Sequence, residues 1–115
     1  MMDLADKDLW RTCALIDGAW VGDTALPPRP LHNPSTGAVL AHIAQGGADQ
    51  ARAAIAAAHR AFAPWAARPA RQRSIILRRW FDLIVAHGED LARLIVMEEG
   101  KPIADCLLYT SDAAD

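Results

Sequence analysis

Apolar residues recur at three- and four-residue steps through residues 71–102, which read RQRSIILRRWFDLIVAHGEDLARLIVMEEGKP. The residues with this spacing are Leu77, Trp80, Phe81, Ile84, Leu91, Leu94 and Ile95. Such spacing places each apolar set on one side of an α-helix. We predict one helix from about Pro69 to His87, with Gly88 as its C-terminal cap. The next helix runs from Glu89 to Gly100, and the pair needs a third element to bury both apolar sides.

An alanine-rich run from Asp49 to Trp65 precedes these helices, and alanine is the best helix former. Its apolar side is formed by Ala51, Ala54, Ile55, Ala58, Phe62 and Trp65. We predict a helix that begins after the Gly46-Gly47 turn and ends at Pro64, because proline removes a backbone N–H. After the third helix, Pro102 precedes Ile103-Ala104-Asp105, which is expected to start a fourth helix that is not completed.

The first 45 residues alternate between short apolar runs and turn residues. Asp17-Gly18 lies between two apolar runs in residues 14–21 and favours a type I′ hairpin, because glycine tolerates positive φ. The stretch from Gly22 to Pro30 is rich in proline and is predicted to be a loop. Residues 4–11 are expected to form one short helical turn, with Leu4 and Trp10 as its apolar contacts.

Asn33-Pro34-Ser35-Thr36-Gly37 is a second predicted turn, since proline suits its second position and glycine a left-handed one. The runs on either side, Leu31-His32 and residues 39–44, are predicted to be extended. Two successive hairpins predict one small antiparallel sheet. The fold class that we expect for residues 1–105 is therefore α+β: an antiparallel β arm of two hairpins, followed by three helices.

The composition narrows the class of protein. A chain of 115 residues with 52% hydrophobic and 23% charged residues is typical of one soluble globular domain. The net charge of −2 gives no field that would attract nucleic acid or an anionic membrane. No apolar run approaches the roughly 20 residues that span a bilayer. The N-terminus, MMDLADKDLWRTC, is acidic where a signal peptide is basic, so we expect a cytoplasmic protein.

The residues that could carry chemistry are scattered along the chain. The histidines are His32, His42, His59 and His87. They lack the spacing of metal ligands, and Cys13 and Cys106 form neither a CxxC pair nor a disulfide framework. Gly46-Gly47 lacks a GxGxxG pattern, and Gly100-Lys101-Pro102 lacks the other residues of a phosphate-binding loop. We predict no catalytic, cofactor-binding or metal-binding residue in this chain.

A run of arginines on the second helix raises the possibility of nucleic-acid binding. Its members are Arg68, Arg71, Arg73, Arg78 and Arg79. In a helix-turn-helix around Gly88, the third helix would enter the major groove, yet that helix carries Glu89 and Asp90. Recognition helices need cationic or amide side chains. We therefore expect the arginines to face solvent, and we expect no nucleic-acid partner.

Four motifs follow one another in a distinctive order between residues 9 and 105: IDGAWV, NPSTGAVL, FAPWAARPARQRSIILRRWFDLI and EDLARLIVMEEGKPIAD. Each is weak alone, but their order resembles the N-terminal portion of the NAD(P)-dependent aldehyde dehydrogenase superfamily. Within it, the chain is most similar to the succinate-semialdehyde (also glutarate-semialdehyde) dehydrogenase branch. Glu99 departs from the pattern, because that branch more often has glutamine at this place.

The resemblance implies a parent enzyme with a Rossmann-like α/β fold, whose cofactor-binding domain begins with these elements. It further implies NAD or NADP as cofactor, a small-molecule aldehyde as substrate and a homo-oligomeric parent. In the family a catalytic cysteine forms a thiohemiacetal and a glutamate acts as base, and both lie downstream of this region. Neither Cys13 nor Cys106 matches the catalytic position. We expect this chain alone to bind no cofactor and to be inactive.

The resemblance ends at Asp105. One codon choice for Cys106 to Asp115 matches the transposon-end adapter used to fragment DNA for short-read sequencing, so we interpret residues 106–115 as non-native read-through. The alternative is a natural frameshift or a divergent C-terminus. Because the parent's parallel sheet would be missing, we predict an exposed apolar patch and poor solubility. The competing functional hypothesis is a free-standing helical protein-interaction module.

Overall fold

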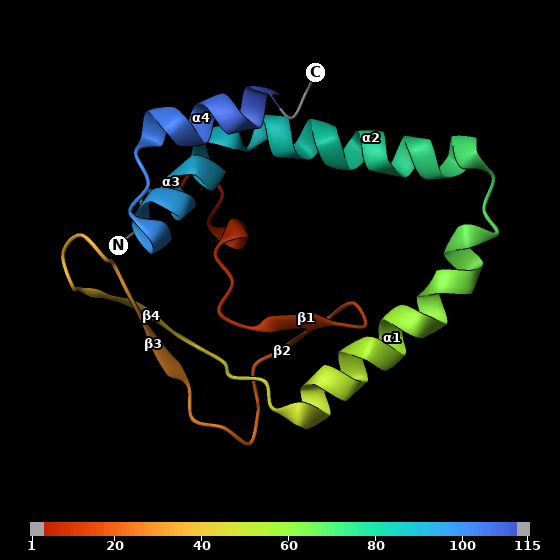
Figure 1. The fold of residues 1–115 in the computed structure, drawn as a ribbon, viewed down its shortest axis with the longest axis horizontal. Helices are drawn as coiled ribbons and strands as arrows, with labels where there is room; N and C mark the ends of the chain where they lie inside the picture. Colours follow the sequence, from red (N-terminus) through yellow and green to blue (C-terminus); the bar gives the residue numbers. More distant parts are fainter. Residues whose placement is uncertain (1–3, 113–115) are drawn as a thin grey trace.

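The computed structural model describes residues 4–112, with side chains as far as Leu107, and this part of the chain forms two hairpins followed by four α-helices (Figure 1). The first segments are a 3₁₀ turn (Lys7–Leu9), β1 (Ala14–Ile16), β2 (Ala19–Val21), β3 (Arg29–His32) and β4 (Val39–Ile43). The helices are α1 (Ala48–Ala66), α2 (Ala70–Ala86), α3 (Gly88–Glu99) and α4 (Ile103–Asp112). The predicted α+β class, with its two antiparallel hairpins, is confirmed.

The first hairpin owes its shape to the dipeptide at its tip. Asp17 and Gly18 have φ values of 52° and 77°, the two positive angles that a type I′ turn requires. Its strands pair Ala14 with Val21 and Ile16 with Ala19. An exposed ion pair links the turn to α1: Arg60 Nη2 lies 2.9 Å from Asp17 Oδ2. Exposed pairs of this kind contribute little to stability, so the turn residues themselves define the hairpin.

The second hairpin corrects two predictions. β3 begins at Arg29 and includes Pro30, which the sequence placed in a loop, and Pro30 pairs with His42. The two hairpins also form separate two-stranded sheets, not one. A strand that contains proline lacks one ladder donor and is restricted to the edge of a sheet, which leaves β3 paired with β4 alone. The hairpins touch where the Ala44 N–H donates to the Thr12 carbonyl at 2.8 Å.

The Asn33–Gly37 turn forms as predicted. The Ser35 N–H donates to Asn33 Oδ1 at 2.9 Å, and Gly37 has a φ of 74°. This turn lies against the C-terminal end of α3. Gly100 caps that helix with a φ of 77°, and a Cβ added there would lie 3.1 Å from Pro34 Cγ. Two motifs that are more than 60 residues apart in the sequence therefore meet in space (Figure 1).

Two helix boundaries differ from the prediction. Pro64 lies inside α1, which continues to Ala66, so the proline does not end the helix where it was predicted to. Gly88 does not cap α2: its φ is not positive, and it is the first residue of α3, while His87 occupies the junction. The start of α1 is as expected, since the Gly47 N–H donates to Gln50 Oε1 at 2.9 Å.

The fourth helix extends beyond its expected beginning. We predicted that Ile103 to Asp105 would start a helix that is not completed, whereas α4 continues to Asp112. Its residue Cys106 is buried, and the helix packs mainly against α3. Residues 113–115 lie outside the described part of the chain.

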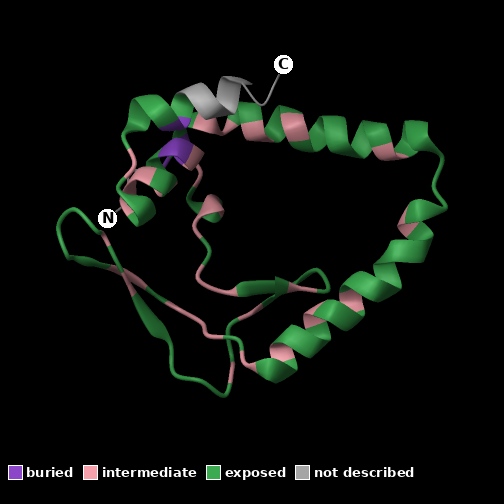
Figure 2. Ribbon diagram, viewed as in Figure 1, coloured by how far each residue is buried: buried purple, intermediate pink, exposed green. Residues whose placement is uncertain are grey.

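The molecule is open. Its radius of gyration is 16.9 Å, where a compact domain of this length has about 13 Å. Its accessible surface is 8737 Å², where a compact monomer of this mass exposes about 6,100 Å². Figure 2 shows α1 and α2 as almost wholly exposed or intermediate along their lengths. Among the side chains of residues 4–107, the hairpins and the two long helices therefore share no common core.

The small core lies where the N-terminal segment meets α3 and α4. Among the described side chains, Leu4, Ala92 and Cys106 are the buried apolar residues. Large apolar side chains on α1 and α2 are half or more exposed: Ile55, Phe62, Ile75, Leu77, Trp80 and Leu83. The predicted exposed apolar patch is thus confirmed. Of the helices within residues 4–112, none is long and apolar enough to cross a membrane.

Two glycines provide a matched test of the α3 boundaries. We expect Gly100→Ala to destabilise the chain by about 1–2 kcal/mol, because its left-handed φ disfavours a Cβ and Pro34 is close. Gly88→Ala is expected to stabilise the chain by up to about 1 kcal/mol, since Gly88 is helical and has open space around it. The urea midpoint of the 222 nm ellipticity measures both. Equal shifts of the same sign would contradict the assigned boundary.

The two cysteines test the packing of α4. Cys13 is partly accessible and Cys106 is buried, so iodoacetamide is expected to alkylate Cys13 at least about tenfold faster. Mass spectrometry of timed samples measures the two rates. In 8 M urea the rates should converge, which serves as the control. Equal rates in the absence of urea would show that Cys106 is not buried by the packing of α4 in solution.

Candidate functional site

The residues singled out as possible ligands or nucleophiles are not brought together. Within the described part of the chain, no three His, Cys, Asp or Glu side chains gather closely enough to hold a metal ion. Cys13 lies against the backbone of Gly22, where an added Cβ would be 2.7 Å from its sulfur. Its nearest polar partner is Thr12 Oγ1 at 3.9 Å, which is not a general base. This geometry offers Cys13 a packing role.

The most buried polar group is Asp90, in the first turn of α3. Its carboxylate accepts the Asp6 N–H at 2.9 Å on Oδ2 and the Ala5 N–H at 3.1 Å on Oδ1. These two hydrogen bonds, that from Asp6 first, hold the pKa of Asp90 below its ordinary value. Burial opposes the shift, while the charges of Arg93 and then His87 add to it. The carboxylate is therefore held in its ionised form and anchors two backbone N–H groups.

The sequence did not predict this anchor. From the sequence, Asp90 was only one of two acidic residues at the start of the third predicted helix. Its partners are backbone N–H groups that lie 84 and 85 residues earlier in the chain. Backbone donors carry no residue-type signal, so sequence pattern alone could not identify the pairing.

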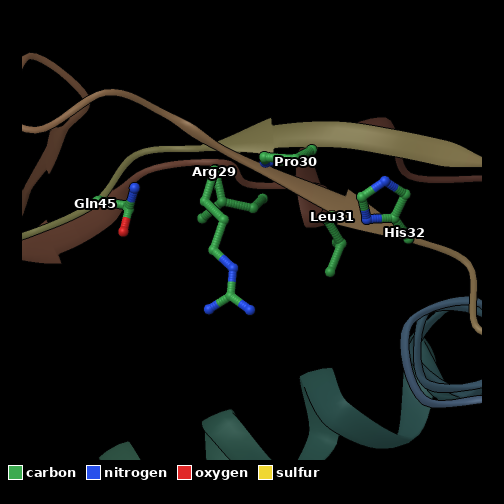
Figure 3. Close-up of a pocket in the computed structure, with 6 residues that line it drawn as sticks. Arg29, Pro30, Leu31, His32 and Gln45 are labelled. Carbon is green, nitrogen blue, oxygen red and sulfur yellow. The ribbon is translucent and has the colours of Figure 1, made fainter.

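One hollow lies beside the second hairpin and has a volume of about 540 Å³. It is lined by Arg29, Pro30, Leu31, His32, Ile43 and Gln45. Figure 3 shows Arg29 extending away from the strand, with Gln45 to one side and His32 farther along β3. The Gln45 amide nitrogen already donates to the Pro27 carbonyl at 2.6 Å. The lining provides a cation and apolar walls but no nucleophile with an adjacent base.

Two smaller hollows are equally poor in catalytic groups. One, of about 370 Å³, lies between the first hairpin and α1 and is walled by alanines and Leu15. The other, of about 490 Å³, lies at the α2–α3 junction and is bounded by Ala5, His87, Asp90 and Arg93. Asp90 there is already engaged by two N–H donors. The expected lack of catalytic, cofactor-binding and metal-binding residues stays a prediction.

The basic run on α2 is largely solvent-facing, as predicted. Arg78 pairs with Asp82 on the same helix at 3.2 Å and lies over the Phe81 ring. Arg68, Arg71 and Arg79 are exposed, whereas Arg73 is half-buried and its Nε atom has no hydrogen-bond partner. On α3, Glu89 pairs with Arg93 at 3.7 Å. This α3 surface presents acidic groups, which suits a phosphate backbone poorly.

Comparison with known proteins identifies the family. The model of the "Aldehyde dehydrogenase family" matches residues 20–115. A 3-sulfolactaldehyde dehydrogenase from Pseudomonas putida is 45% identical over 105 residues, which are 91% of this chain and 22% of that protein. A succinate-semialdehyde dehydrogenase [NADP(+)] from Escherichia coli K12 is 44% identical over 113 residues, covering 98% of this chain and 23% of that protein.

The fold agrees with this family: the crystal structure of an aldehyde dehydrogenase from Brucella melitensis superposes with a TM-score of 0.89 at 34% identity, over 96% of this chain and 23% of that one. The crystal structure of an E. coli NADP-dependent enzyme superposes with a TM-score of 0.90 at 42% identity, over 97% of this chain and 23% of that one. The chain thus spans less than a quarter of the length of these relatives. The matched residues include the Asn33–Gly37 turn, α1 and the α3 cap, the features on which the resemblance depended. The chain belongs to the aldehyde dehydrogenase family.

Proposed function

We propose that this chain is the N-terminal part of an NAD(P)-dependent aldehyde dehydrogenase that oxidises a small aldehyde to the carboxylic acid. The main support is the 44–45% sequence identity to two dehydrogenases over nine-tenths or more of this chain. The uncovered faces of α1 and α2 support the proposal. Amphipathic helices bury their apolar sides against another layer, and such a layer is missing within residues 4–112. The rest of a longer enzyme would supply it.

The two relatives suggest a substrate class. Succinate semialdehyde carries a carboxylate and 3-sulfolactaldehyde a sulfonate, in each case on the carbon chain away from the aldehyde. We propose that the full enzyme acts on a short aldehyde with an acidic group at its far end, and that succinate semialdehyde is the leading candidate. The proposed cofactor is NADP or NAD, held outside this chain. The cytoplasmic location and the homo-oligomeric parent stay predictions.

Residues 106–115 form part of the same proposal. We interpret them as adapter sequence that replaced the natural continuation after Asp105. The alternative function, a free-standing helical interaction module, draws on the same exposed faces of α1 and α2. The two proposals differ in what the gene encodes after codon 105, so DNA sequence decides between them.

The first test is to amplify and resequence the source locus across codon 105. We expect the frame to continue without the Cys106–Asp115 codons and to encode a cysteine and a glutamate downstream. The complete enzyme should then oxidise succinate semialdehyde while it reduces NADP or NAD. It should also oxidise at least one of two other acidic aldehydes, glutarate semialdehyde or 3-sulfolactaldehyde. Butanal, which lacks the acidic group, is the control and should have a kcat/KM at least about tenfold lower.

Three outcomes of this test are informative. A stop codon directly after residue 115 in the natural gene would overturn the enzyme proposal and favour the interaction module. An active enzyme that prefers butanal would overturn the substrate class and leave the family activity intact. The 115-residue chain is expected to show no aldehyde-dependent reduction of NAD or NADP, and turnover by this chain would contradict the inactivity proposed for it.

The exposed apolar faces lead to a separate prediction about the chain in isolation. Because α1 and α2 leave large side chains in water, we expect the 115-residue chain to self-associate and to unfold over a broad temperature range. Sedimentation velocity and a thermal scan at 222 nm measure this. A monomer that melts in one sharp transition would show that these faces need no covering layer.

A further inference from the structure

A single carboxylate connects the N-terminal segment to α3. Residues 4–6, here called the N-terminal strap, include Leu4, one of the three buried apolar residues among the described side chains. The next two residues, Ala5 and Asp6, donate their backbone N–H groups to opposite oxygens of Asp90, at 3.1 and 2.9 Å. The strap therefore has one apolar contact and one two-pronged polar anchor.

Other charged groups surround this anchor at longer range. Arg93 Nη1 lies 3.9 Å from Asp90 Oδ1, and His87 Nδ1 lies 3.9 Å from the Asp6 carboxylate. Glu89, on the exposed side of α3, pairs with Arg93 at 3.7 Å. These separations exceed hydrogen-bond length. The backbone donors of the strap are thus the closest polar partners that Asp90 is seen to have.

We propose that Asp90 is a latch that docks the N-terminal strap on α3, and that loss of its negative charge releases the strap as a unit. Release would remove Ala5 from the wall of the 490 Å³ hollow at the α2–α3 junction and would widen it. This inference is independent of the proposed enzymatic function, because it concerns contacts within the chain itself.

The chemistry of the latch requires a carboxylate. Both Asp90 oxygens accept, one from each strap residue. An asparagine side chain has one carbonyl oxygen, and its NH₂ group can only donate. Asp90→Asn would therefore keep the shape, satisfy one strap N–H and set a donor against the other. Hydrogen bonds to a charged acceptor are also stronger than those to a neutral one.

The pH dependence follows from the direction of the pKa shift. The folded pKa of Asp90 lies below the ordinary value of about 3.9, because the strap donors favour the ionised form. The latch is therefore fully closed above the ordinary pKa and opens as the pH falls through the lower, folded value. The His87 imidazole and the Asp6 carboxylate, 3.9 Å apart, are the other ionisable groups of the α2–α3 junction and the strap that face this anchor.

Amide hydrogen exchange by NMR on the 115-residue chain tests the latch, with Asp90→Asn and Glu89→Gln as matched variants. Each variant removes one negative charge from the first turn of α3. In the wild type, we expect the Ala5 and Asp6 amides to be protected. In Asp90→Asn they should exchange at least about tenfold faster, while α1 amides change little. Glu89→Gln should leave the strap amides within about twofold of the wild type.

Three results would contradict the latch. Unprotected Ala5 and Asp6 amides in the wild type would show that it does not form. Equal effects of the two variants would show that net charge and not the latch holds the strap. If Asp90→Asn exposes α3 and α4 amides equally, Asp90 holds the whole core and not a separable strap. A wild-type pH titration gives a second readout: both strap amide shifts should follow one midpoint below about pH 3.9.

Discussion

The architecture of this chain depends on one requirement of amphipathic helices, that an apolar side has to be covered. α1 and α2 each have such a side, and within the described residues nothing covers it: Phe62 is 70% exposed and Trp80 is 62% exposed. A radius of gyration of 16.9 Å is the global sign of the same fact. Because hydrophobic burial is the main favourable contribution to folding, helices without a partner layer are weakly held in place.

Within the described residues, the buried side chains gather around α3. There the N-terminal strap, the Asn33–Gly37 turn and α4 contact one short helix, although they lie far apart in the sequence. Each contact uses a different kind of complementarity. Asp90 supplies charge to backbone donors, Gly100 supplies space for Pro34, and Ala92 is small enough to be completely buried. The most specific tertiary contacts of the described residues therefore lie around α3, whereas α1 and α2 keep their apolar sides exposed.

The proposed function rests on family membership and not on a recognised catalytic site. None of the three hollows described above places a nucleophile beside a general base. The family membership explains this arrangement without added chemistry, because the matched relatives are more than four times as long. In such a relative, a piece of this kind can provide a scaffold for catalytic residues located elsewhere.

The sequence by itself determined the local structure. Asp17-Gly18 fixed a hairpin, Gly37 and Gly100 fixed left-handed positions, and the apolar spacing after Arg71 defined two helices, because backbone preferences and periodicity are properties of neighbouring residues. The order of the motifs also indicated the family. Only the tertiary structure decided that Gly88 starts a helix and that α4 extends past Asp105. It alone showed Asp90 holding two distant N–H groups, since such contacts depend on which surfaces meet, and residue types along the chain do not record that.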